Sequence, residues 1–84
     1  MPEEKVGQVI KYFTKPMVAA VEITTGVIRV GDRLHFAGHT TDFEMLAASI
    51  QEEHASLEEA RPGQLVGIKV PDRVRAGDQV FKVS

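Results

Sequence analysis

The chain has 84 residues, of which 43% are hydrophobic and 26% charged, with no cysteine and a formal net charge of −2. This size and composition predict a single globular domain over residues 1–84. Disulfides, thiolate metal sites and cysteine nucleophiles are excluded. The net negative charge argues against binding of nucleic acid by bulk electrostatics alone.

The chain begins with an acidic and polar segment, residues 1–5, which we expect to be a flexible N-terminus. It is not followed by an apolar run of the length found in secretion signals or membrane-spanning helices. The sequence therefore predicts no membrane association and a cytoplasmic location.

Short apolar segments separated by glycine turns dominate the chain and predict strands. In chain order the predicted strands cover residues 6–13, 17–23, 27–30, 33–36, 65–70 and 80–83. Two of the intervening turns contain glycine followed by aspartate, Gly31-Asp32 and Gly77-Asp78. Glycine can adopt the positive φ of such a turn, and the aspartate side chain can accept hydrogen bonds from nearby backbone N–H groups.

Residues 41–60 leave two interpretations open. Apolar residues at helical spacing and a capping box that begins at Thr41 favour a helix. A strand requires Leu46, Ala48 and Ile50 to share one face, with a bulge just before them. From propensity alone, the helix is the favoured interpretation.

The best candidate contact surface follows the predicted strand 65–70. Lys69, Arg73 and Arg75 place three cations in or beside a predicted loop, within reach of RNA phosphates or of an acidic protein partner. The alternative is a solvated loop, because isolated exposed charges contribute little.

Histidines and aspartates give no catalytic or metal site. His35 and His39 have a spacing that suits two metal ligands on one helix face, but they lie at a predicted strand end. His54 lies apart from them in sequence. Asp32 and Asp78 each follow a turn glycine, so a role in the turn is favoured over acid–base chemistry. No catalytic residue, metal site or cofactor site is predicted.

The aromatic residues also have two interpretations. Tyr12, Phe13 and Phe43 could stack on nucleic-acid bases. We favour the core for all three, because so small a chain needs its aromatic side chains inside.

Several segments, taken in order, resemble domain 2 of elongation factor Tu and its relatives among the translational GTPases. The segments are Val6-Gly7-Gln8-Val9, Val21-Glu22-Ile23, 26–34, Ser49-Ile50-Gln51, 60–68 and 76–80, so the resemblance covers residues 6–83. The pattern is also similar to small stand-alone proteins of the translation-elongation-factor-like kind and to the C-terminal domains of U32 peptidases. The resemblance implies an all-β fold, a small closed antiparallel β-barrel, with strands rather than a helix in residues 41–60.

The resemblance also implies a function. The chain lacks the Gly-x-x-x-x-Gly-Lys-Ser/Thr run that holds nucleotide phosphates, so no nucleotide hydrolysis and no cofactor are expected. In the full factors this barrel helps to hold the acceptor end of a charged transfer RNA or touches ribosomal RNA. We therefore expect a non-catalytic binding module that contacts RNA or the ribosome. The alternative is a protein-interaction or assembly domain with no nucleic-acid role.

Overall fold

A computed structural model describes residues 3–83, and every regular element in that range is a β-strand. The ten strands are β1 (Glu3–Phe13), β2 (Val18–Ile23), β3 (Ile28–Arg29), β4 (Arg33–Ala37), β5 (Asp42–Leu46), β6 (Ile50–Glu52), β7 (Ala55–Leu57), β8 (Glu59–Ala60), β9 (Leu65–Lys69) and β10 (Gln79–Val83). The all-β prediction is confirmed. No helix in the described range is long and apolar enough to cross a membrane.

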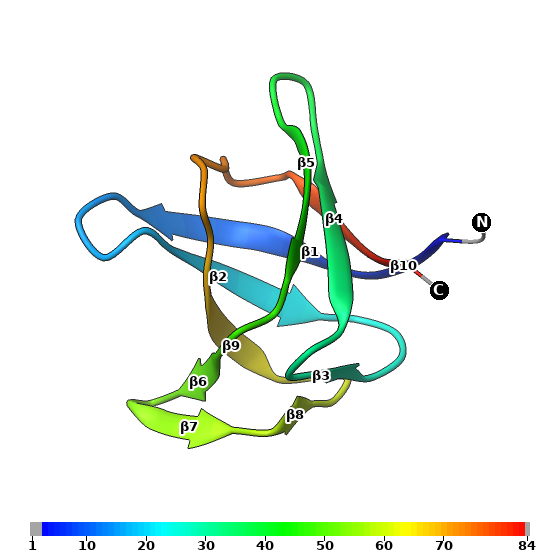
Figure 1. Cartoon of the computed structure of the whole chain (residues 1–84), viewed down its shortest axis with the longest axis vertical. Helices are drawn as coiled ribbons and strands as arrows, with labels where there is room; N and C mark the ends of the chain where they lie inside the picture. The colour runs from blue at the N-terminus through cyan, green and yellow to red at the C-terminus, as the bar shows by residue number, and fades with distance from the viewer. Residues whose placement is uncertain (1–2, 84) are drawn as a thin grey trace.

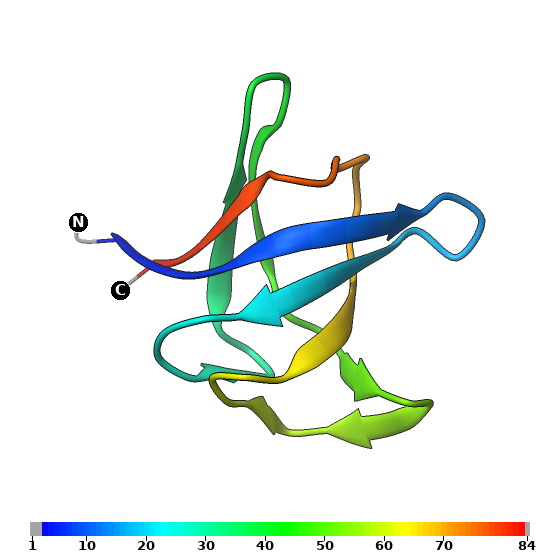
Figure 2. The ribbon, with the colours of Figure 1, turned by 180° about the vertical axis from the view of Figure 1, so that it is seen from behind.

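Eight strands form one antiparallel sheet in the order β5-β4-β10-β1-β2-β9-β6-β7, and β3 pairs separately with β8. Figures 1 and 2 show this sheet wrapping round a common centre, with β1 and β2 on one side and β4 and β5 on the other. Within residues 3–83 the hydrogen-bond ladder ends at β5 and at β7. The sheet therefore curls like a barrel without being closed by backbone hydrogen bonds.

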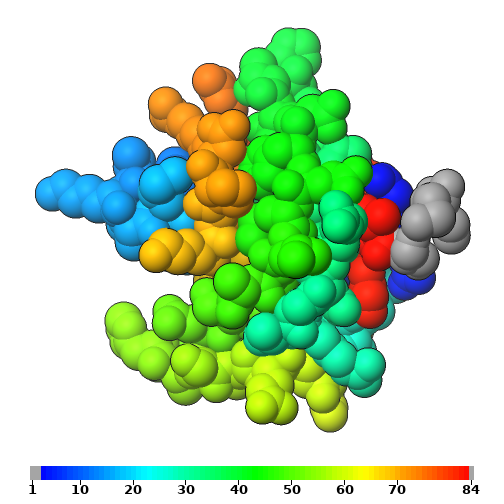
Figure 3. Space-filling view, in the orientation of Figure 1, coloured from blue at the N-terminus to red at the C-terminus, as the bar shows by residue number. Residues whose placement is uncertain are grey.

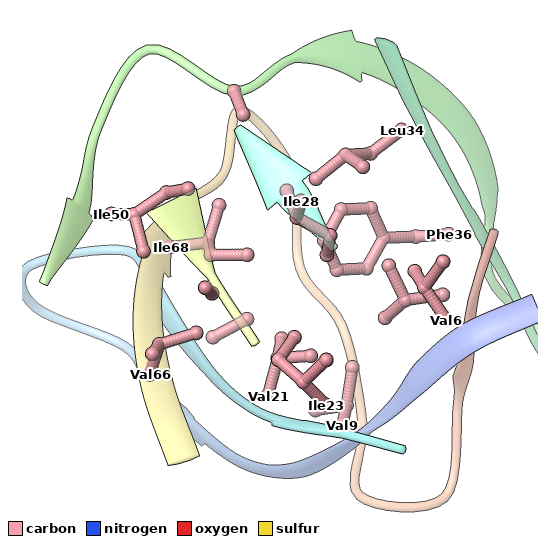
Figure 4. Packing of buried hydrophobic residues seen from close by; sticks show 14 of the residues in the cluster. Val6, Val9, Val21, Ile23, Ile28, Leu34, Phe36, Ile50, Val66 and Ile68 are labelled. Atoms are coloured by element: carbon pink, nitrogen blue, oxygen red, sulfur yellow. The ribbon is translucent and has the colours of Figure 1, made fainter. Parts of the chain in front are cut away.

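The core lies inside this curl and consists almost entirely of aliphatic side chains. Figure 4 shows Val6, Val21, Phe36 and Ile68 converging from β1, β2, β4 and β9. Phe36 is fully buried, and its ring stacks on that of Phe43, with centroids 5.3 Å apart. Alternate residues of β2 and β4 point inward, which gives these strands the period-two burial expected of strands with one wet face.

The segment 41–60 forms strands, so tertiary pairing overrides its helical propensity. Ile50 pairs with Ile68 of β9 and with Leu57 of β7, contacts that a helix could not provide. The strand interpretation of this segment placed Leu46, Ala48 and Ile50 on one face, and this prediction was wrong. Leu46 is 57% exposed, whereas Ala47 and Ile50 are buried, so the break in alternation falls after Ala47 rather than before Leu46.

Three turns share one backbone design, which we call the bridging turn: residues 29–32, 61–64 and 75–78. In each turn the N–H of the first residue donates to the side-chain oxygen of the fourth. The bonds run from Arg29 to Asp32 (2.8 Å), from Arg61 to Gln64 (2.6 Å) and from Arg75 to Asp78 (2.9 Å). The third residue is a glycine with a φ of 92° to 97°, a conformation that only glycine adopts at little cost.

Each bridging turn also makes two backbone hydrogen bonds with one residue that lies far from it in sequence. That residue accepts from one N–H of the turn and donates to one carbonyl of the turn. Val9, for example, accepts from the N–H of Gly77 and donates to the carbonyl of Asp78, both at 2.8 Å. Ile23 and Ala47 make the same pair of bonds to the turns 61–64 and 29–32. The turn roles predicted for Asp32 and Asp78 are confirmed, and the third copy was missed because glutamine replaces aspartate.

The N-terminal segment is more ordered than the sequence suggested. Glu3 pairs with Val83 and Lys5 with Phe81, so residues 3–5 belong to β1. The prediction of a flexible segment over residues 1–5 therefore fails for these three residues, because β10 offers them a pairing edge. Residues 1–2 lie outside the described range.

Candidate functional site

Two of the three predicted contact residues line one hollow. A pocket of about 300 Å³ lies between the start of β5 and the segment that follows β9. We call it the edge cleft. It is lined by Thr40, Thr41, Asp42, Phe43, Asp72, Arg73 and Arg75. In Figure 3 the segment after β9 (orange) lies directly beside the green segment that contains β5. Lys69, at the end of β9, is exposed but does not line the cleft.

The sequence between β9 and β10 explains why both arginines reach the cleft. Val74 is buried in the core, so its neighbours on either side point outward. The N–H of Arg73 donates to Oδ1 of Asp72 (2.7 Å), and the N–H of Arg75 donates to the Oδ2 of Asp78 (2.9 Å). These bonds hold the backbone on both sides of Val74 and leave the two guanidinium groups directed away from the core.

A close approach at Gly38 fixes the bridging turn beneath Arg75. Asp78 is 6% exposed, and a Cβ on Gly38 would collide with its carboxylate. Gly38 lies in the β4–β5 hairpin, where its N–H donates to the carbonyl of Thr41 (2.7 Å). The hairpin that supplies one wall of the cleft therefore packs against the turn that supplies the other.

The charges of the edge cleft are of both signs. Within residues 3–83, no carboxylate lies within 4.0 Å of the side-chain nitrogens of Arg73 or Arg75, in contrast to Arg33 and Arg61. The two acidic residues are Asp42 on the β5 side, which pairs with His35, and Asp72 beside Arg73, which accepts from the N–H of Arg73. Because a backbone N–H is neutral, Asp72 keeps its charge. Among residues 3–83, two guanidinium groups and one carboxylate of the cleft therefore have no charged partner, an excess of positive charge.

His35 is held between two carboxylates beside the cleft. Its Nδ1 lies 3.0 Å from both oxygens of Glu3, and its Nε2 lies 2.5 Å from Oδ1 of Asp42. Carboxylates only accept hydrogen bonds, so this geometry suits an imidazolium with both ring nitrogens protonated. The hydrogen bond to Glu3, and then that to Asp42, raise the pKa of His35 above its ordinary value of 6.5.

This raised pKa makes one contribution to stability dependent on pH. The folded protein binds the His35 proton more tightly than the unfolded chain, so the contribution is complete below about pH 6.5 and is lost as pH rises through the higher folded pKa. We therefore expect His35→Gln to lower the urea midpoint of unfolding more at pH 5.5 than at pH 8.5. If His35→Gln lowered the urea midpoint equally at both pH values, the raised pKa of His35 would be contradicted.

The other histidines lie in turns, His39 between β4 and β5 and His54 between β6 and β7. Across residues 3–83, no three His, Asp or Glu side chains are arranged to hold a metal ion.

The prediction that the aromatic side chains lie in the core holds for two of the three residues. Phe43 and Tyr12 are partly buried and pack against the core, as predicted. The prediction for Phe13 was wrong. This residue is 41% exposed, and Nζ of Lys11 lies 5.1 Å from the centre of its ring. Phe13 pairs with Val18 on β2, and Val18 lies opposite Lys69 on β9, so all three share the outer face of the sheet.

A second hollow, of about 410 Å³, is lined by Arg29, Val30, Glu58 and Glu59. It lies over the short pair β3–β8, whose residues pair with each other. Its glutamates outnumber its arginine. The edge cleft therefore remains the better candidate site.

Residues 6–83 match the family described as elongation factor G domain 2. The chain belongs to this family. That membership confirms the resemblance to translational GTPases drawn from the sequence, and it covers nearly the whole chain. An aIF5B from Aeropyrum pernix, solved with GDP bound, has the same fold: its TM-score is 0.65 at 23% identity, over 95% of this chain and 14% of that one.

The chain is also similar to proteins of another kind. The crystal structure of the C-terminal domain of a protein from Geobacillus thermoleovorans described as a U32 peptidase matches with a TM-score of 0.89 at 27% identity. The match covers 96% of this chain and 93% of that one. An uncharacterized protease of Methanocaldococcus jannaschii is 33% identical and a collagenase of Porphyromonas gingivalis 35% identical, each over 92% of this chain. The chain spans about a fifth of the length of these curated relatives (19% and 22%).

Only one wall of the edge cleft was predicted from the sequence. Arg73 and Arg75 were found because they are cations in a short loop. The opposite wall, residues 40–43, was missed because it lies about thirty positions earlier in the chain. Only the long-range packing of the β4–β5 hairpin brings the two walls together.

Proposed function

We propose that this chain is a non-catalytic module that binds a polypeptide in the edge cleft. The observation that carries the proposal is the lining of that cleft. Two arginines that have no carboxylate partner among residues 3–83 face the wall formed by residues 40–43, which contains two threonines and Asp42. A polypeptide offers both donors and acceptors to such a surface, and one acidic side chain can pair with the arginines. The relatives named as a protease and a collagenase are consistent with a polypeptide ligand.

An RNA ligand suits the same cleft less well. RNA-binding surfaces follow the phosphate backbone with several cations, and affinity grows with each phosphate neutralised. Here two arginines are accompanied by Asp42 and Asp72, and Lys69 lies outside the cleft. The net charge of −2 adds no long-range attraction. RNA or ribosome contact through Lys69, Arg73 and Arg75 is therefore the competing function that the experiment must separate.

The test is a fluorescence-anisotropy titration with three labelled probes. They are reduced, carboxymethylated α-lactalbumin as an unfolded acidic polypeptide, a transfer RNA and a single-stranded RNA. We expect binding of the polypeptide. The double variant Arg73→Ala/Arg75→Ala should weaken it at least about tenfold, because each charged hydrogen bond contributes about 1.5–3 kcal/mol.

The matched control is Arg29→Ala/Arg61→Ala, which removes the same charge from two other bridging turns, outside the edge cleft, and should change the affinity less than about twofold. If instead both RNAs bind at about 50 mM salt, with a log–log salt slope near −2 that falls by about 1.4 in Arg73→Ala/Arg75→Ala, the RNA function replaces this proposal.

A further inference from the structure

The backbone of β5 has one edge bonded and one edge open. The β4–β5 ladder pairs Phe36 with Phe43 and Leu34 with Met45. Just outside it, the N–H of Gly38 donates to Thr41 and the N–H of Ala47 donates to Asp32. In an antiparallel ladder hydrogen-bonded pairs alternate with non-bonded pairs. The backbone groups of Phe43 and Met45 therefore point to β4, and those of the residues between them point the other way.

Three residues present unpaired backbone groups along this open edge: Asp42, Glu44 and Leu46. Within residues 3–83, no hydrogen bond is made by the backbone N–H or carbonyl of any of them. Buried or half-buried backbone groups normally find partners, and free sheet edges are a site of pairing with further strands. The edge is five residues long, enough for a short added strand.

The edge opens onto the cleft already described. Its first residues, Asp42 and Phe43, line the edge cleft, and the facing segment 70–75 forms no strand pairing with β5. Ala47, Val70 and Val74 are buried in the core. The edge cleft is therefore bounded on one side by the start of the open β5 edge and on the other by Arg73 and Arg75.

We propose that an extended peptide with an acidic side chain binds as an added antiparallel strand on the open edge of β5, with that side chain between Arg73 and Arg75. This mode rests on the proposed function and specifies how the polypeptide is held. Antiparallel pairing is chosen because every strand pair of this fold is antiparallel. The main chain supplies affinity and the arginines supply selectivity.

The geometry fixes which peptide residues bond to β5. Asp42, Glu44 and Leu46 alternate with the partly buried Phe43 and Met45, so their side chains face outward. Residues directly opposite each other in an antiparallel pair share a face. The peptide residues that donate to β5 therefore have outward side chains. The acidic residue is one of these, because both guanidinium groups are directed away from the core. The residues with inward side chains direct their N–H groups toward the segment 70–75.

The probe is the end-capped seven-residue peptide Val-Thr-Val-Glu-Val-Thr-Val, in which the threonines and the glutamate have outward side chains. Two versions carry N-methyl groups, one on the threonines and the glutamate and the other on every valine. Methylation of the threonines and the glutamate should weaken binding at least about tenfold, since it removes the donors facing β5, each worth about 0.5–1.5 kcal/mol. Methylation of the other set should change affinity less than about threefold. Replacing the central glutamate by lysine should also abolish most of the binding.

A pair of protein variants tests the edge itself. Glu44→Pro removes the backbone N–H that Glu44 presents on the open edge of β5, and it breaks no hydrogen bond to β4. Glu44→Ala keeps this N–H and removes only the carboxylate that pairs with Arg33. We expect the proline variant to bind the peptide about fivefold more weakly than the alanine variant, the loss expected for one backbone hydrogen bond of about 1 kcal/mol. The methylated peptides keep the test decisive if the proline variant does not fold.

The outcomes separate the two proposals. If neither carboxymethylated α-lactalbumin nor the peptide binds, the proposed function fails. If α-lactalbumin binds but the peptide does not, or if the two methylated peptides bind equally, strand addition is overturned and the polypeptide-binding function stands. If sedimentation shows a dimer that Glu44→Pro disperses and Glu44→Ala does not, a second copy of the chain occupies the edge and strand addition of a peptide is overturned.

Discussion

Replacing Phe36 by alanine is expected to lower the free energy of unfolding by about 3–5 kcal/mol, the range for removing a fully buried aromatic ring. Phe36 has no exposed surface and stacks on Phe43 at the centre of the core. A domain of this length has a total stability of about 4–12 kcal/mol. The variant should therefore lose a large part of its stability, and its Tm should fall by at least about 12 °C. Thermal and urea unfolding followed by circular dichroism measure both quantities.

The matched control is Phe13→Ala, the same chemical change on the outer face. Phe13 is 41% exposed and contacts Lys11, so its loss should cost less than about 1 kcal/mol. Comparable losses for the two variants would show that Phe36 is not the centre of the core.

Replacing Gly7 by alanine is expected to cost about 2–3 kcal/mol, even though it adds only a methyl group. A Cβ at this position would overlap the backbone carbonyl oxygen of Glu22 on β2 and lie 3.2 Å from its carbonyl carbon. A backbone group cannot rotate away as a side chain can. The β1–β2 ladder would have to separate in the middle of the sheet, next to the register shift that occurs between Lys5 and Gly7. Urea midpoints at a constant m-value measure the loss.

Gly67→Ala provides the comparison for this variant. Its Cβ would lie 3.1 Å from Cγ1 of Val18, a half-buried side chain on the outer face, and its other near neighbour is 3.9 Å away. Val18 can shift into solvent, so we expect a loss below about 1 kcal/mol. A Gly67→Ala variant as unstable as Gly7→Ala would exclude backbone overlap as the cause.

The strands were predictable wherever short-range signals agreed. The alternation of β2 and β4 and the glycine-aspartate turns at residues 31–32 and 77–78 are local patterns, and the structure confirms them. Residues 41–60 could not be assigned from their own pattern, because the pairing of Ile50 with Ile68 depends on a strand far along the chain. The family resemblance, not periodicity, gave the correct assignment there.

The site was predictable only from one side. Arg73 and Arg75 stood out as cations flanking an apolar residue, and Val74 proves to be the anchor that turns them outward. Nothing local in Thr41 or Asp42 indicates that they form the facing wall. The open edge of β5 is likewise a property of the whole sheet, since it follows from which strand lies beside it.

The place of β10 has a consequence for how the protein is made. β10 is the last strand in the chain, yet it lies between β4 and β1 in the sheet and pairs with both. Until residues 79–83 have been synthesised, the β4–β5 hairpin has no strand joining it to β1 and β2. Ribosomes add about 5–20 residues per second, so the earlier strands wait for seconds with these edges unpaired. The sheet must then assemble by contacts between residues far apart in sequence, a topology that folds slowly and only after residues 79–83 have been synthesised.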